Sequence, residues 1–149
     1  MNAIQLCKKI EKSKNPITRK VYIRLLRILF SCDYVPTCKL GEGILLNHNG
    51  LGSVLWAKSI GDNTQIWQNV ILGAGKGDKN SGYFPTIGNN VKIYTGAVVI
   101  GNITVGDGAI IGANAVVTHD VPPKAVVAGV PAKIIRMVEA ETDEHTQDV

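Results

Sequence analysis

The chain has 149 residues, enough for one domain with a sizeable core, and its 45% hydrophobic and 19% charged residues are typical of a globular protein. Its longest apolar runs are far too short to span a bilayer, and Lys and Arg interrupt the first thirty residues, which excludes a signal peptide there. Residues 1–30 hold eight of the sixteen Lys and Arg and one acid, which gives this segment a net charge of +7. Since the whole chain has a net charge of +4, the remainder carries −3.

Two helices are expected in this basic segment, the first over residues 3–13. Asn15 offers an N-cap with Pro16 at the first helical position, and apolar residues at helical spacing continue to about Phe30. The second helix either packs on the rest of the domain with its charged face in water, or presents a basic surface to anionic lipid or a lipid-linked substrate at the membrane periphery. Nucleic-acid binding is disfavoured because no aromatic stacking platform or recognised motif accompanies the basic residues.

The three cysteines, Cys7, Cys32 and Cys38, are odd in number and share no metal-ligand spacing. This usage favours a reducing, cytoplasmic compartment. A disulfide between Cys32 and Cys38 stays open as an alternative.

A repeat of short strands is expected to begin near Asp33 and to continue to residue 132. Its regular spacing of six slips to eight between Leu46 and Val54, and the slip contains His48. A second interruption, over residues 74–84, is polar and glycine-rich and predicts an extruded loop, a place that commonly carries function in such repeats.

The repeat is most regular from Ile87 to Val117, where an aliphatic residue recurs every six positions and a small or aliphatic residue follows four positions later. This period fits neither a helix nor a free-standing strand, and it is the period of a β-solenoid built from hexapeptide rungs. The leading residues are Ile87, Ile93, Val99, Val105, Ile111 and Val117. Because only 5% of the residues are aromatic, stacked aliphatic rungs must form the core.

Prolines at 122 and 123 should end the rungs, since proline cannot donate to a β ladder. Residues 133–149 should form a short closing helix and an acidic tail, with five acids in residues 139–149. The expected domains are therefore a helical segment over 1–32, the solenoid over 33–132 and the closing segment.

From Asp33 to Ile135 the sequence resembles the hexapeptide-repeat acyltransferases, closest to the branch of serine acetyltransferase-like enzymes and polysaccharide O-acetyltransferases. The resemblance rests on residues 43–48, 66–73, 101–103 and 121–132. It implies a left-handed parallel β-helix with three flat faces, acetyl-CoA as the acyl donor and a homotrimer. The handedness follows from the resemblance alone.

Two residues depart from the family pattern at the acceptor site. Asn47 stands where the family has an aspartate before its catalytic histidine, and Phe84 stands where a histidine precedes Pro85. The family enzyme also carries a large helical N-terminal domain, whereas about thirty residues precede the repeat here. These departures favour a sugar hydroxyl of a surface polysaccharide or its precursor as acceptor. The alternatives are serine O-acetylation in cysteine biosynthesis and a non-catalytic solenoid that binds a partner.

His48 and Asp33 match the family's catalytic histidine and aspartate. Imidazole suits a general base because its unperturbed pKa of about 6.5 lies near working pH, and a carboxylate on its other nitrogen fixes the tautomer. One solenoid turn takes roughly eighteen residues, so the fifteen between Asp33 and His48 bring them to neighbouring levels.

The donor site is assigned by the resemblance. Backbone N–H groups at Gly73, Ala74 and Gly75 would approach the thioester, and Thr95 and Ala113 match positions along the cofactor arm. Lys133 and Arg136 either contact the CoA phosphates or are ordinary solvated charges. Trp56 and Trp67 either line the groove or cover a subunit face.

No metal site is expected. A zinc site of the related carbonic anhydrases needs three imidazoles around one metal. Of the three histidines here, His119 should be exposed and His145 lies in the tail.

Overall fold

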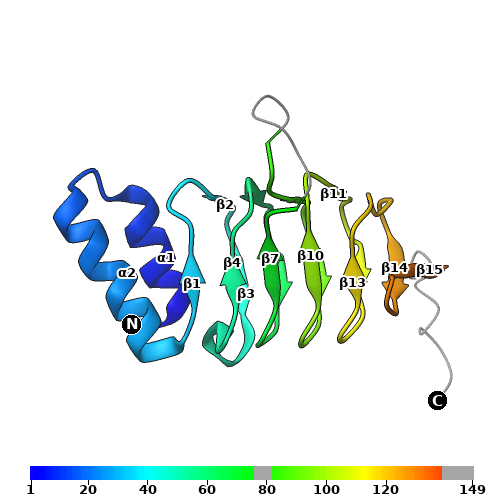
Figure 1. Ribbon diagram of the computed structural model, residues 1–149, viewed down its shortest axis with the longest axis horizontal. Helices are drawn as coiled ribbons and strands as arrows, with labels where there is room; N and C mark the ends of the chain where they lie inside the picture. The colour runs from blue at the N-terminus through cyan, green and yellow to red at the C-terminus, as the bar shows by residue number, and fades with distance from the viewer. Residues whose placement is uncertain (76–81, 139–149) are drawn as a thin grey trace, which may run out of the picture.

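The computed structural model describes residues 1–75 and 82–138, so part of the expected loop and the acidic tail lie outside the described residues. Two helices, α1 (Ala3–Lys12) and α2 (Pro16–Phe30), cover one end of a coil of short strands, and β14 and β15 lie at the other end (Figure 1). The strands are β1 (Asp33–Tyr34), β2 (Lys39–Leu40), β3 (Leu45–Leu46), β4 (Val54–Leu55), β5 (Ser59–Ile60), β6 (Gln65–Ile66), β7 (Ile71–Gly73), β8 (Thr86–Ile87), β9 (Lys92–Ile93), β10 (Val98–Ile100), β11 (Thr104–Val105), β12 (Ile110–Ile111), β13 (Val116–Val117), β14 (Ala125–Ala128) and β15 (Lys133–Met137).

Local signals fix both helices. The Asn15 side chain accepts hydrogen bonds from the N–H groups of Ile17 (2.8 Å) and Thr18 (3.3 Å), and Pro16 occupies the first turn, which confirms the predicted start of α2. At the start of α1, Asn2 forms a capping box with Gln5. The helices pack on each other and on the coil end. Leu26 is the only buried residue of α2, and Ile17, Val21, Ile28 and Leu29 of its apolar residues are exposed, so the packing alternative holds for only part of this helix.

The coil has three faces, and the chain visits them in turn. The strand orders are β1-β4-β7-β10-β13, β2-β5-β8-β11 and β3-β6-β9-β12-β14-β15, and every pairing is parallel except that of β14 with β15. Each circuit thus adds one short strand to each sheet, which is the predicted solenoid.

The interior contains the predicted aliphatic rungs. All six leading residues from Ile87 to Val117 are buried, and so are the small residues four positions after them. The sequence spacing predicts that Val54 points into the core, and this is wrong. Leu55 is fully buried instead, whereas Val54 is only half-buried. The turn after Leu46 takes up one residue more than the spacing suggests, so the alternation places Leu55 inside.

The expected C-terminal helix is also wrong. Residues 133–137 form β15, which pairs antiparallel with β14 through the register Ala128↔Lys133 and Ala125↔Met137. The turn between them is held to β13, since Val116 N–H donates to the Gly129 carbonyl (3.0 Å) and Ala132 N–H to the Val116 carbonyl (2.9 Å). The chain therefore folds back onto the open edge of β14 instead of forming a helix.

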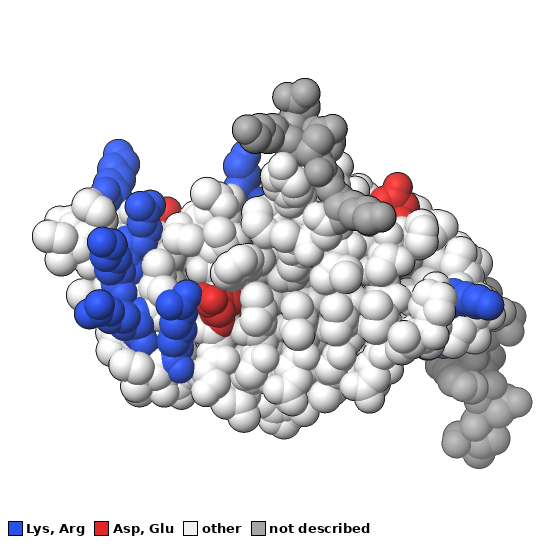
Figure 2. All heavy atoms as spheres, in the orientation of Figure 1, with Lys and Arg blue, Asp and Glu red and all other residues white. Residues whose placement is uncertain are grey.

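Lys and Arg side chains gather over the helical end of the molecule, while the visible coil face is largely uncharged (Figure 2). In the described part of the chain, no helix is long and apolar enough to cross a membrane. Contact of residues 1–30 with a lipid surface stays a prediction. Cys7, Cys32 and Cys38 are all buried free thiols, so the disulfide alternative is wrong.

Candidate active site

His48 lies in a turn, η1 (Asn47–Gly50), that leads from β3 to β4. Three consecutive residues there have left-handed backbone: His48 (φ 52°), Asn49 (φ 56°) and Gly50 (φ 63°). Left-handed backbone is costly for a residue with a Cβ and is often found where a functional side chain must be aimed. The His48 side chain is exposed, and no hydrogen bond to its ring occurs within residues 1–75 and 82–138.

Asp33 begins β1 and lies beside the same turn. Its N–H donates to the Ser53 carbonyl (2.9 Å), and Asp33 pairs with Val54, the first residue of β4. A Cβ added to Gly50 would lie 3.6 Å from the Cys32 Sγ, so the turn packs directly on the residue before Asp33. The register therefore places Asp33 and the His48 turn on neighbouring levels of one corner.

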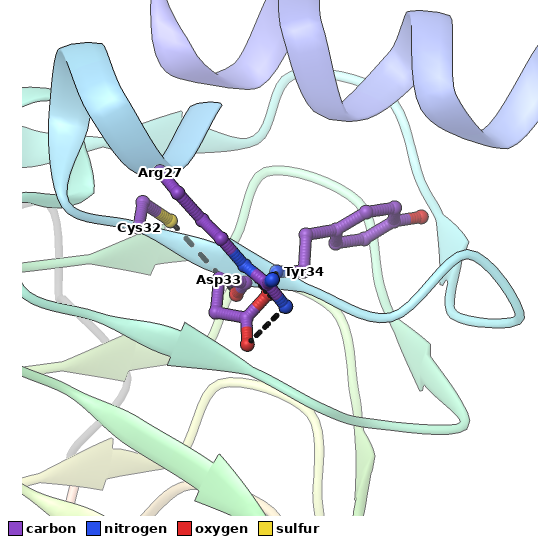
Figure 3. Close-up of polar contacts among 4 residues, drawn as sticks. All are labelled: Arg27, Cys32, Asp33 and Tyr34. Atoms are coloured by element: carbon purple, nitrogen blue, oxygen red, sulfur yellow. Dashed lines mark hydrogen bonds and ion pairs between the residues drawn. The ribbon is translucent and has the colours of Figure 1, made fainter. Parts of the chain in front are cut away.

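The Asp33 carboxylate contacts a residue that the sequence had not indicated. The Arg27 guanidinium in the last turn of α2 binds both carboxylate oxygens, and the Tyr34 N–H donates to Oδ1 (3.0 Å) (Figure 3). Only the opposite charges at positions 27 and 33 on either side of a helix end could have suggested this pair.

Asn47, the first of the two altered acceptor positions, lies directly before His48. Its Nδ2 atom is buried, and so is the Oε1 atom of Gln68 on the next level of the coil. Among the described residues neither atom has a hydrogen-bond partner. Buried polar atoms without a hydrogen-bond partner are rare, so these two atoms leave hydrogen-bonding capacity unused at this corner. Gln68 was not indicated by the sequence.

We call the corner that contains residues 47–53, 67–70, 94–97 and 112–115 the His48 corner. Thr95 and Ala113, the positions assigned to the cofactor arm, lie on it at higher levels, and the Asn114 N–H donates to the Thr95 carbonyl (3.0 Å). Trp67 lies there too and stacks on Tyr94, with ring centroids 4.4 Å apart. A single line of residues thus runs along this corner from His48 to Ala113.

The described ends of the expected loop lie at the opposite end of the β4 and β7 strands, at what we call the loop corner (residues 35–38, 56–58, 74–75, 82–85, 101–103 and 118–120). Here Phe84 packs edge-on against Trp56, with centroids 6.2 Å apart. A cavity of about 340 Å³ lies beside Gly75 at this corner. It is lined by Gly75, Ile100, Gly101, Asn102, Ile103, Thr118 and His119.

The glycines at the loop corner permit close backbone contact. A Cβ at Gly75 would lie 2.6 Å from the Gly101 Cα, so no larger residue fits there without a shift. The Gly75 N–H already donates to the Tyr83 carbonyl (3.1 Å). The Gly75 N–H is therefore already used in the hydrogen bond that closes the base of the loop. What Gly75 contributes to this corner is its small size.

The remaining candidates lie apart from both corners or face water. Lys133 and Arg136 lie exposed on β15 at the far edge of a sheet. His119 is exposed, as predicted, and its Nδ1 lies 3.0 Å from the Thr118 hydroxyl oxygen. In the part of the chain that is described, no three His, Cys, Asp or Glu side chains are arranged to hold a metal ion.

Comparison with known proteins connects this geometry to one family. Residues 84–119 match the family described as bacterial transferase hexapeptide (six repeats). The serine acetyltransferase of Synechococcus elongatus is 37% identical over 135 residues, which cover 89% of this chain and 54% of the relative. The chain belongs to the hexapeptide-repeat acyltransferase superfamily.

Solved structures agree with this membership. The crystal structure of the Neisseria gonorrhoeae serine acetyltransferase superposes with a TM-score of 0.86 at 30% identity, covering 97% of this chain and 58% of that one. A serine acetyltransferase in complex with CoA gives a TM-score of 0.77 at 33% identity, with 89% and 55% covered. The chain shares the left-handed parallel β-helix of these enzymes, which confirms the predicted solenoid.

The comparisons overturn the expected carbohydrate acceptor and, with it, a role in polysaccharide synthesis. Curated relatives that are 35–40% identical to the chain are serine acetyltransferases. The departures at Asn47 and Phe84 concern two positions, whereas the likeness extends over the coil and the helices before it. The chain spans about half the length of the curated relatives it matches first.

Proposed function

We propose that the chain transfers the acetyl group of acetyl-CoA to the hydroxyl of L-serine. The observation that supports this most is the His48 corner, where the exposed His48 lies on left-handed backbone in a turn one level from the start of β1 at Asp33. Serine acetyltransferases of the same fold align along nearly the whole chain.

His48 is the general base of this proposal. Its imidazole takes the proton of the serine hydroxyl as that oxygen attacks the thioester carbonyl. The tetrahedral intermediate then collapses, the C–S bond breaks, and the imidazolium returns the proton to the leaving CoA thiolate. Asp33 accepts a hydrogen bond from the other ring nitrogen, which fixes the tautomer and stabilises the imidazolium.

The donor would lie along the His48 corner. Thr95 and Ala113 continue the line of residues that begins at His48, so the pantetheine arm can run along the coil with its thioester near the imidazole. Gly73, Ala74 and Gly75 would border the thioester from the loop corner, and Lys133 and Arg136 would meet the CoA phosphates by charge-assisted contacts.

Within one chain, the His48 corner and the loop corner lie at opposite ends of the strands of the sheet β1-β4-β7-β10-β13. A complete site therefore needs the loop corner of a second copy to approach the His48 corner of the first. We infer a homotrimer in which each of three sites lies between neighbouring coils. Light scattering should give three times the chain mass of 16.0 kDa, and a monomer would contradict both the assembly and the shared site.

The acceptor would bind between Asn47 and Phe84. Both lack the charge that the resembled family has at these positions, so serine binding here relies on neutral groups. This predicts a weaker serine site than one with a carboxylate and an imidazole, and not a different reaction.

The test is release of free CoA from acetyl-CoA, followed with a thiol reagent, with L-serine, with L-threonine and without acceptor. We expect release that depends on serine, and O-acetylserine as the product by mass spectrometry. If acetyl-CoA binds by calorimetry but serine causes no release, the acceptor is wrong. If acetyl-CoA does not bind, the chain is a non-catalytic binding module.

A further inference from the structure

Arg27 and Asp33 form a forked ion pair at the junction of the helices and the coil (Figure 3). The Arg27 Nε lies 3.0 Å from Asp33 Oδ1, and its Nη2 lies 2.9 Å from Oδ1 and 3.0 Å from Oδ2. Two guanidinium nitrogens on one carboxylate define its orientation as well as its position, which a single contact does not.

The local structure brings these two residues together. Ser31 ends α2 in left-handed backbone (φ 48°), and its N–H donates to the Arg27 carbonyl (3.0 Å). The chain reverses there, the fully buried Cys32 anchors it, and Asp33 enters β1. The last turn of α2 therefore faces the first residue of the coil, and both partners belong to ordered elements.

The contacts leave a defined part of the carboxylate open. Oδ1 accepts from Arg27 Nε, Arg27 Nη2 and the Tyr34 N–H, whereas Oδ2 accepts only from Arg27 Nη2. A carboxylate offers about two lone-pair directions on each oxygen. Oδ1 is thus saturated, and the open acceptor direction belongs to Oδ2.

We propose that Arg27 is a positioning residue that holds the Asp33 carboxylate so that Oδ2 receives the ring N–H of His48. Arg27 touches neither substrate nor cofactor and acts through Asp33. The proposal rests on the proposed function, because it assigns Asp33 as the partner of the general base.

A purely stabilising role fits the pair less well. The side chains are 57% (Arg27) and 25% (Asp33) exposed, and ion pairs at such exposure contribute little to stability. Orientation of a reactive pair, in contrast, is sensitive to small displacements of its partner groups. Loss of Arg27 should therefore lower turnover far more than it lowers stability.

The experiment compares Arg27→Gln and Arg27→Lys with Arg24→Gln, a matched control one turn earlier on α2 that carries an exposed charge. We expect Arg27→Gln to lower kcat about tenfold or more with KM for acetyl-CoA unchanged. Arg27→Lys, which keeps the charge without the fork, should fall between Arg27→Gln and wild type. The control should match wild type.

A double-mutant cycle tests whether Arg27 acts through Asp33. In the Asp33→Asn background, Arg27→Gln should lower kcat no further. Additive losses would overturn the proposal, and so would an Arg27→Gln enzyme with wild-type kcat. Thermal unfolding checks that the variants fold.

A second readout does not depend on turnover. The proposal predicts that the His48 ring signals in an NMR pH titration shift in Arg27→Gln and not in Arg24→Gln. If wild type shows no serine-dependent turnover but this titration difference appears, the proposed function fails and the positioning role stands. If serine is turned over but neither kcat nor the titration responds to Arg27→Gln, the positioning role fails alone.

Discussion

The Gly50 backbone lies against the Cys32 thiol, so that a Cβ at residue 50 would be 3.6 Å from Sγ. This contact joins the turn that carries His48 to the strand that carries Asp33. Gly50 also has φ 63°, which disfavours any residue with a Cβ. The approach of the His48 turn to the chain before Asp33 thus depends on the packing of Gly50 on Cys32.

We predict that Gly50→Ala lowers both stability and turnover. The left-handed backbone should cost about 1–2 kcal/mol in the free energy of unfolding, measured by urea denaturation. Gly108→Ala is the matched control, since Gly108 has φ 67° and lies at the third corner of the coil. Both variants should lose similar stability, but only Gly50→Ala should lose kcat. Equal kcat values would show that the turn does not position His48.

A second prediction separates the chemistry of His48 from its backbone. Asparagine tolerates left-handed backbone better than most residues, so His48→Asn should keep the turn and the unfolding midpoint. Turnover should fall about a hundred- to ten-thousand-fold, the usual loss for a general base. Acetyl-CoA binding, measured by calorimetry, should be retained. Wild-type turnover in this variant would remove His48 from the mechanism.

How much the sequence revealed depends on how local each feature is. The start of α2 was predictable because Asn15 and Pro16 act within one turn, and the rungs because the period repeats. Leu55 was missed because the slip before it resets the alternation by one residue. The strand β15 was missed because it forms on the open edge of β14, which exists only after the coil has folded.

The site shows the same division. The neighbouring levels of Asp33 and the His48 turn could be predicted from the separation of fifteen residues, whereas the pairing of the two side chains stays a prediction. Arg27 could not be added, because its contact requires α2 to end in a reversal at Ser31. The orphaned Gln68 amide oxygen likewise reflects the packing of neighbouring levels at the His48 corner.

The buried thiols give a third prediction. Burial raises the pKa of Cys32 to about 12, with a contribution from Asp33, and burial likewise raises the pKa of Cys38 to about 12. The folded protein should therefore react slowly with a thiol reagent at pH 8, and unfolding in guanidinium should expose all three thiols. Rapid labelling of the folded protein would contradict this burial.

The same shifts set a sign for stability at high pH. The folded protein holds these thiol protons to a higher pH than the unfolded chain, whose thiols have the ordinary cysteine pKa of 9.0. Stability is therefore unaffected by these groups below pH 9 and falls as the pH rises from about 9 toward about 12. A Cys38→Ala variant should lose less stability over this range than wild type in urea unfolding at each pH.

The last prediction concerns the acceptor. Asn47→Asp with Phe84→His restores the two groups that the resembled family has at these positions, and the carboxylate can pair with the serine ammonium. We expect a lower KM for L-serine with an unchanged KM for acetyl-CoA. The cost is the edge-on contact of Phe84 with Trp56, about 0.5–1.5 kcal/mol of stability for such a pair. Asn47→Asp with Phe84→Leu makes the matched control, since leucine also loses this contact but supplies no imidazole. An unchanged KM for serine in the double variant would place the acceptor away from both residues.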